Sequence, residues 1–261
     1  MLKRLGTNIR FYILTSTVCI IIGVFAWTYS TTPAGSVRTI KLVEHFAMLA
    51  ILYLYLALLV TPLYEAFPRL PFRSPVHKAR RAIGFSAFLF GLFHAYNAFF
   101  GLLGGFKGLG LLSPTYLKAI TLSFTALCIL TAMASTSFDV VVKRLGYRKW
   151  KRLHRLVYIA AIFIVIHALM LGSDFANSSS LFYQLVFFAV AFLFCLEMLR
   201  VDRLVQARIP ALRRWNLITF LAIILVVGMY ANNTAKSGQG ILLKVHNHRV
   251  SFTFTQRSSV F

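Results

Sequence analysis

Seven apolar runs separated by basic connectors constrain what this chain can fold into. They lie at about 11–28, 43–63, 82–101, 115–135, 154–172, 181–199 and 215–230. A helix that crosses a membrane needs roughly 20 predominantly apolar residues, which most of these runs provide. Of the 261 residues, 59% are hydrophobic and 13% are charged, whereas soluble domains are about 25% charged. The pattern predicts an all-α, polytopic transmembrane helix bundle and excludes a soluble globular enzyme.

The distribution of Lys and Arg predicts how the helices are oriented. With the N-terminus in the cytosol, 20 of the 28 basic residues fall in inner segments and 8 in outer segments. This split follows the positive-inside rule and predicts seven crossings, with the N-terminus inside and the C-terminus outside. The net charge of +22 is then mostly a topology signal, and we expect no nucleic-acid partner. The inner basic loops remain candidates for contact with membrane lipid, an acidic partner protein, or a flavin or quinone.

Four segments follow from this organisation. Residues 1–40 are expected to form the first transmembrane helix and an outer loop, and residues 41–200 a helical core. Residues 201–230 should form a basic inner loop and a seventh helix, and residues 231–261 an outer tail that contains a short hairpin. The first apolar run is longer than the 7–15 residues of a signal-peptide core, which favours an uncleaved anchor.

Two histidines inside apolar runs are the strongest functional candidates, because an ionisable residue in a membrane helix is costly. His94 lies 13 residues after Arg81, and His167 lies 13 residues after His154. At 1.5 Å per residue, both side chains are at roughly 20 Å from the inner boundary. Two imidazoles at one height on parallel helices can bind one haem iron from opposite faces. The alternative is that each is a core histidine bonded to a neighbouring carbonyl.

The second ring nitrogen of each histidine needs an acceptor, for which Asn97 and nearby main-chain carbonyls are candidates. His154 could serve a second haem on the inner side, although the residues at its depth, just before the run at 82–101, are Arg80 and Arg81. The loop residue His77 is a weak alternative partner. On an ideal helix His154 and His167 are about 140° apart, so they face one interior only around a kink. Otherwise His154 is an interfacial residue of a basic segment.

Three further features give weaker signals. The Glu44–His45 pair near an outer helix end is typical of a solvated or substrate-facing pair. His246 and His248 alternate as strand residues do, but two ligands are too few for a metal site. The glycine-rich run 101–110 follows no strand, so we interpret it as a flexible helix connector and not a phosphate loop. The chain has no c-type haem attachment motif.

Two motifs resemble the ferric-reductase-like transmembrane family. They are Arg80-Arg-Ala-Ile-Gly-Phe-Ser-Ala-Phe-Leu-Phe-Gly-Leu-Phe-His94 and Lys143-Arg-Leu-Gly-Tyr-Arg-Lys-Trp-Lys-Arg-Leu-His154-Arg-Leu-Val-Tyr158. His167 follows the second motif at the family's spacing. The resemblance covers about 40–200, and within the family it is to the MsrQ (YedZ) group. Members of that group are haem-binding membrane subunits paired with a periplasmic molybdenum-dependent methionine sulfoxide reductase.

The resemblance implies b-type haem in a six-helix core, with electrons moving outward across the membrane. It implies His94 and His167 as iron ligands and His154 as a further ligand candidate. Arg80 and Arg81, at the depth of His154, are further candidates for binding the cofactor. One haem b is expected and two can be accommodated, and FMN or a quinone are further cofactor candidates. The helix at 82–101 has one histidine where oxidase relatives have two, which leaves the haem number open. The seventh helix and tail go beyond the six-helix core.

These observations predict a membrane cytochrome b subunit in the bacterial inner membrane. It would relay electrons from a separate donor, a cytosolic flavin reductase or quinol, to an extracytoplasmic acceptor such as a periplasmic methionine sulfoxide reductase. It would thus be an electron-transfer subunit of an oxidoreductase system, with no nicotinamide-binding domain of its own. The alternatives are a ferric or cupric reductase acting at the outer face, and a haem-free transporter or assembly protein.

Overall fold

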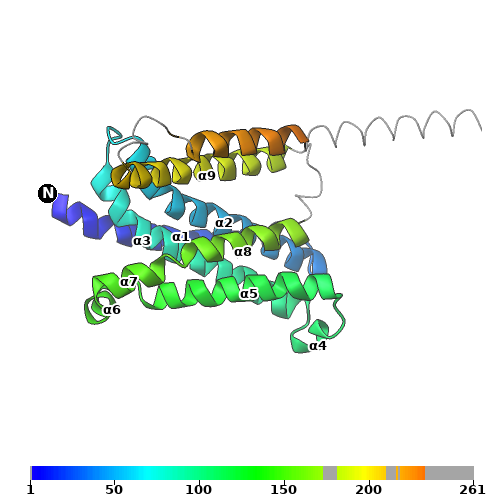
Figure 1. The fold of residues 1–261 in the computed structure, drawn as a ribbon. Coiled ribbons are helices and arrows are strands. Elements are labelled where there is room, and N and C mark those ends of the chain that lie inside the picture. Colours follow the sequence, from blue (N-terminus) through cyan, green and yellow to red (C-terminus); the bar gives the residue numbers. More distant parts are fainter. Residues whose placement is uncertain (1, 173–180, 210–215, 217, 233–261) are drawn as a thin grey trace, which may run out of the picture. The chain divides into compact units, whose positions relative to one another are not determined.

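The computed structural model describes residues 2–172, 181–209, 216 and 218–232 (Figure 1). All regular structure in these residues is helical, which confirms the predicted all-α class. The chain divides into two compact units, Met1–Gly172 and Ser173–Phe261. The predicted hairpin of the tail, with His246 and His248, lies outside the described residues.

The first unit contains most of the helices. They are α1 (Leu2–Thr31), α2 (Ser36–Ala66), α3 (Arg73–Tyr96), the π-helix η1 (Asn97–Leu102), α4 (Phe106–Leu109), α5 (Pro114–Ser135), α6 (Asp139–Leu145), α7 (Tyr147–His154) and α8 (Val157–Leu171). The second unit contains α9 (Leu181–Arg208) and a helix at Ile218–Asn232. Within the second unit, the carboxylate of the buried Asp202 accepts hydrogen bonds from the main-chain N–H groups of Ile218 and Thr219, which caps the last helix.

Six helical segments are long and apolar enough to cross a membrane. They are Ile9–Thr31, Ser36–Ala66, Arg73–Leu102, Pro114–Ser135, Tyr147–Leu171 and Tyr183–Arg208. The predicted seventh helix is present at Ile218–Asn232 and is shorter than these six. The orientation with the N-terminus inside stays a prediction.

Helices α1, α2 and α3 pack together around aromatic side chains. Phe46 and Phe90 are fully buried. The ring of Phe46 lies 5.3 Å from the ring of Phe25 on α1 and 5.3 Å from the ring of Phe93 on α3, measured between centroids. Aromatic pairs at such distances add to the free energy gained from burial alone. This cluster therefore fixes α3 against both of its neighbours.

Side-chain contacts show which ends of the helices meet. Helix α2 is antiparallel to α3, and α5 is antiparallel to α8, which it contacts along its length (Figure 1). Helices α3 and α8 run in the same direction within the first unit, because His94 in the last turn of α3 lies beside His167 of α8, and Arg81 near the start of α3 lies beside Trp150, which precedes α8. Both start at one end, which we call the arginine end (Arg10, Arg80 and Arg81). Both finish at the other, which we call the histidine end (His94 and His167).

The glycine-rich run after α3 is helical for part of its length, and is not simply a flexible connector. Residues Asn97–Leu102 form a π-helix, in which the N–H of Leu103 bonds to the carbonyl of Ala98 at 3.0 Å. A Cβ at Gly101 would collide with the methyl group of Thr39 on α2, so glycine is required for this close approach. Gly104 and Gly105 then turn the chain with φ of +66° and +75°.

A buried hydrogen bond between α1 and α3 gives a test of their packing. The hydroxyls of Thr17 and Ser86 are 2.7 Å apart and both residues are fully buried. We expect Thr17→Val and Ser86→Ala to couple by about 0.6 kcal/mol in a double-mutant cycle, the mean for hydrogen bonds between membrane helices. The measurement is the free energy of unfolding in mixed micelles. Thr131→Val, which removes only a bond within α5, should not couple to Ser86→Ala, and a coupling of zero for Thr17 would contradict the packing.

Candidate functional site

The two candidate intramembrane histidines lie next to each other in the first unit. His94 is in the last turn of α3 and His167 is in α8. Their ring centroids are 6.3 Å apart and the ring planes make an angle of 80°. Residues separated by more than seventy positions in the sequence are therefore neighbours at the histidine end.

Each of these rings is held by a main-chain carbonyl of the antiparallel helix beside it. The Nδ1 atom of His94 is 3.0 Å from the carbonyl oxygen of Val43 on α2. The Nδ1 atom of His167 is 3.0 Å from the carbonyl oxygen of Ala119 on α5. A carbonyl only accepts hydrogen bonds, so Nδ1 must carry the proton in both rings. Each Nε2 atom then presents a lone pair, which is the state that binds a metal ion.

The spacing of the rings fits one metal ion between them. Imidazole nitrogens bind first-row metals at about 2.0 Å, and Nε2 lies about 1 Å from the ring centroid, so two rings on opposite sides of one ion have centroids about 6 Å apart. The observed 6.3 Å matches this spacing. His94 and His167 could therefore hold haem iron as a pair of axial ligands.

An apolar wall adjoins His94. The neighbouring residue Phe93 packs on Phe46 and also on Phe25, at 5.8 Å between ring centroids. Asn97, which the sequence left open as a partner of His94, donates its side-chain N–H to the carbonyl of Phe93 at 2.7 Å instead. Both histidines therefore donate to main-chain carbonyls. Because every residue has a carbonyl, the sequence alone does not identify which carbonyls accept these hydrogen bonds.

His154 lies at the arginine end, where the chain leaves the helical path. Residues 155–156 form a turn between α7 and α8, which provides a break between His154 and His167. The Nε2 atom of His154 is 3.4 Å from the hydroxyl oxygen of Thr136, and its ring lies 4.2 Å from the indole of Trp150. His77 packs on Tyr64 at 5.5 Å and is not beside this ring.

The two candidate arginines have different surroundings. Arg80 turns towards α2, where its guanidinium donates to the carbonyl of Ala57 at 2.8 Å and to the hydroxyl of Thr61 at 2.9 Å. The guanidinium of Arg81 lies 5.3 Å from the centre of the Trp150 ring. The structure thus brings Arg81 and His154 into contact with the same tryptophan, Trp150, which the sequence analysis did not single out.

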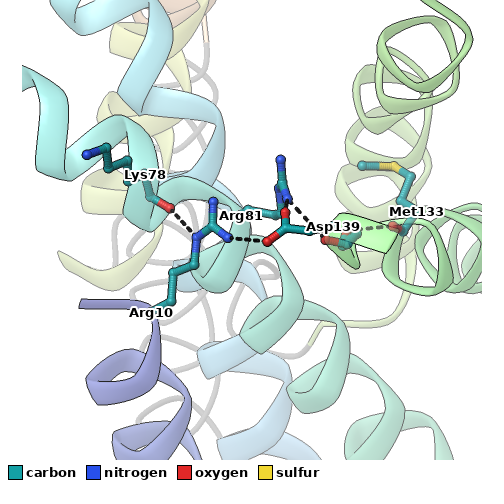
Figure 2. A network of polar contacts seen from close by, with 6 residues as sticks. Arg10, Lys78, Arg81, Met133 and Asp139 are labelled. Atoms are coloured by element: carbon teal, nitrogen blue, oxygen red, sulfur yellow. Dashed lines mark hydrogen bonds and ion pairs between the residues drawn. The ribbon is translucent and has the colours of Figure 1, made fainter. Parts of the chain in front are cut away.

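One carboxylate joins three segments at the arginine end (Figure 2). Asp139, the first residue of α6, forms ion pairs with Arg81 of α3 and with Arg10 of α1, the latter at 3.3 Å. Arg81 also donates to the carbonyl of Ser137 at 3.3 Å. Partial burial raises the pKa of Asp139, but the hydrogen bonds and charges of Arg81 and Arg10 outweigh it and hold that pKa below its ordinary value. The sequence signal for this residue was a lone acid among basic segments, in a chain with only six Asp and Glu.

The remaining candidates do not join either cluster. His45 contacts the hydroxyl of the buried Thr28 at 3.3 Å, while Glu44 pairs with Lys41 at 2.8 Å and not with its neighbour. Among the residues that the structure describes, no group of three or more His, Cys, Asp or Glu could hold a metal ion.

The fold and the facing imidazoles define a multi-pass integral membrane helix bundle with a candidate metal centre in its interior. Residues 46–165 match the family described as the ferric reductase like transmembrane component. The matched range includes His94 and His154 and ends just before His167. The resemblance predicted from the two motifs is therefore confirmed, and the chain has a ferric-reductase-like transmembrane region.

The chain is also similar to curated bacterial proteins. Relatives from Brucella ovis, Brucella canis and Brucella suis bear the name protein-methionine-sulfoxide reductase heme-binding subunit MsrQ. Each is 31% identical over 148 residues, which are 55% of this chain. The match spans 64% of the length of these relatives. No solved structure has significant similarity to the chain.

The carboxylate of Asp139 gives a pH-dependent prediction. Its side chain is 66% exposed, so we expect Asp139→Asn to lower the free energy of unfolding at neutral pH by less than about 1 kcal/mol. Because the folded-state pKa lies below the ordinary 3.8, this stabilisation is complete above pH 3.8 and is lost as the pH falls through the folded-state pKa. Thermal unfolding in detergent at neutral pH and at about pH 3 measures the difference in stability between wild type and variant, which should be smaller in acid. A gap of the same size at both pH values would show that the ion pairs do not contribute.

Proposed function

We propose that this chain is a membrane cytochrome b subunit in which His94 and His167 are the two axial ligands of one haem b. The proposal rests on the geometry of these two rings. Their centroids are 6.3 Å apart, and the Nδ1 atom of each is hydrogen-bonded to a main-chain carbonyl. The relatives are named as a heme-binding subunit, which supports haem as the group between the two rings.

The protein's contribution is to orient the two imidazoles before the cofactor binds. The carbonyls of Val43 and Ala119 fix the protonation state of each ring, and they raise the basicity of the Nε2 atom that meets the iron. Each histidine and its carbonyl come from one antiparallel helix pair, α2 with α3 and α5 with α8. When bound, haem b supplies a one-electron Fe(III)/Fe(II) couple.

The arginine end is the proposed entry side for electrons. Its cations support a cytosolic position for this end, by the positive-inside rule. We propose that His154, with Arg80 and Arg81, borders a second cofactor there, either a second haem or a flavin or quinone group. The donor is a cytosolic flavin reductase or quinol, and the bilayer is the bacterial inner membrane.

The acceptor at the opposite face is proposed from the names of the relatives. Their name supports a protein-methionine-sulfoxide reductase on the extracytoplasmic side. The name of the matched family supports a second candidate, direct reduction of Fe(III) or Cu(II) at that face. Stopped-flow oxidation of the dithionite-reduced protein separates the two. One sample receives a purified molybdenum-dependent reductase with its sulfoxide substrate, and the other receives ferric citrate. Only the true acceptor should reoxidise the protein rapidly.

The axial pair is tested by replacing each histidine. We expect His94→Ala and His167→Ala each to remove the contribution of this haem to the b-type α-band of the reduced-minus-oxidised spectrum, because a single imidazole leaves the iron without its second protein ligand. Pyridine-haemochrome analysis measures the haem-to-protein ratio in the same samples. His77→Ala is the matched control, since its ring packs on Tyr64 away from the pair, and it should keep the band.

Two outcomes would contradict the proposal. Retention of the full α-band in both histidine variants would place the haem elsewhere. Wild-type protein that binds no haem when haem is supplied would favour a transporter or assembly role for the chain.

A further inference from the structure

One buried polar atom at the arginine end has no partner. Among the buried side-chain nitrogen and oxygen atoms of the described residues, the indole Nε1 of Trp150 alone makes no hydrogen bond. A buried donor without an acceptor is rare in folded proteins, and each one calls for an explanation such as a water, an ion or a bound group. The position of this N–H therefore indicates where an acceptor oxygen would be stabilised.

The contacts of the Trp150 ring connect it to the proposed inner cofactor site. Its centroid lies 4.2 Å from that of His154, with 34° between the planes. Tyr147 stacks on the same indole at 5.8 Å and 26°. These three residues are spaced by three and four positions on α7, so they share one face of that helix. A cofactor that meets His154 would lie next to the indole.

The charges around the indole favour an anionic acceptor. The guanidinium of Arg81 lies over the ring, and it shares the single carboxylate of Asp139 with Arg10. Two cations on one anion leave one positive charge uncompensated in this group. The exposed surface of α6, α7 and the following turn adds further basic residues: Lys143, Arg144, Arg148, Lys149, Lys151, Arg152 and Arg155. A carboxylate or phosphate oxygen would be stabilised in this field more than a neutral carbonyl.

We propose that Trp150 is a cofactor-contacting residue, whose Nε1–H donates a hydrogen bond to a carboxylate or phosphate oxygen of the redox group bound beside His154. Asp139 is a positioning residue, because its carboxylate holds Arg81 over the indole. The inference rests on the proposed function, which assigns a cofactor to this end of the bundle. Two sources supply the required oxygen, the propionate of a second haem and the phosphate of a flavin mononucleotide.

The test uses Trp150→Phe in the full-length protein, because phenylalanine keeps a stacking ring and removes only the N–H and part of the ring. Trp27→Phe is the matched control, since Trp27 is 64% exposed near the opposite end of α1. Haem-depleted protein is titrated with hemin in one arm and with FMN in the other. The molar equivalent of hemin or FMN that His154→Ala fails to bind is the one that belongs to the arginine end.

We expect Trp150→Phe to weaken binding of the His154-dependent equivalent by roughly tenfold, as for loss of a hydrogen bond to a charged group. A loss in the hemin arm assigns the oxygen to a propionate, and the midpoint potential of that haem should then fall, because its negative charge is less compensated. A loss in the FMN arm assigns it to the phosphate. Asp139→Asn should weaken the same equivalent by a smaller factor, and Trp27→Phe should leave both arms unchanged.

The controls separate failure of this inference from failure of the proposed function. The equivalent that depends on His94 and His167 should be intact in Trp150→Phe, which shows that the variant is folded. If His154→Ala removes an equivalent that Trp150→Phe leaves at full affinity, the N–H meets only a water and the inference is overturned. If neither hemin nor FMN binds in a His154-dependent way, the inference is overturned, and so are the haem and FMN alternatives proposed for the arginine end.

Discussion

Two hydrogen bonds from imidazole N–H groups to main-chain carbonyls determine what the interior of this bundle can do. A histidine within a membrane helix has no water to satisfy its second nitrogen, so its ring turns towards whatever acceptor the neighbouring helix offers. The carbonyls of Val43 and Ala119 provide that acceptor, and they leave both Nε2 atoms directed away from the main chain that holds them. The antiparallel pairing of α2 with α3 and of α5 with α8 is thus a condition for the site as well as for the fold.

The parallel course of α3 and α8 gives the first unit two chemically different ends. One end has the facing imidazoles beside a wall of phenylalanine rings. The other has arginines that share the carboxylate of Asp139, and a histidine and a tryptophan whose rings are in contact. The 13-residue spacing between these ends corresponds to roughly 20 Å along a helix, so a transmembrane electron relay through the unit would need a group at each end.

The sequence predicted the helices and the equal depth of His94 and His167, because apolar length and residue spacing are written directly into it. It could not predict the carbonyl partners, since every residue has a carbonyl and only packing selects one. Trp150 and Asp139 were missed for a related reason, because their roles depend on contacts with Arg81 on another helix. The turn at 155–156 and the π-helix after His94 are local departures from ideal helices, which hydropathy patterns do not detect.

The central claim is that His94 and His167 bind one haem iron together, and electron paramagnetic resonance of the oxidised protein tests it most directly. Two imidazoles whose planes are 80° apart, as observed here, predict a low-spin ferric signal of the strongly anisotropic type that perpendicular axial rings give. His94→Ala and His167→Ala should each abolish this signal. Absence of this signal from the wild-type protein with bound haem, or its survival in either variant, would contradict the account.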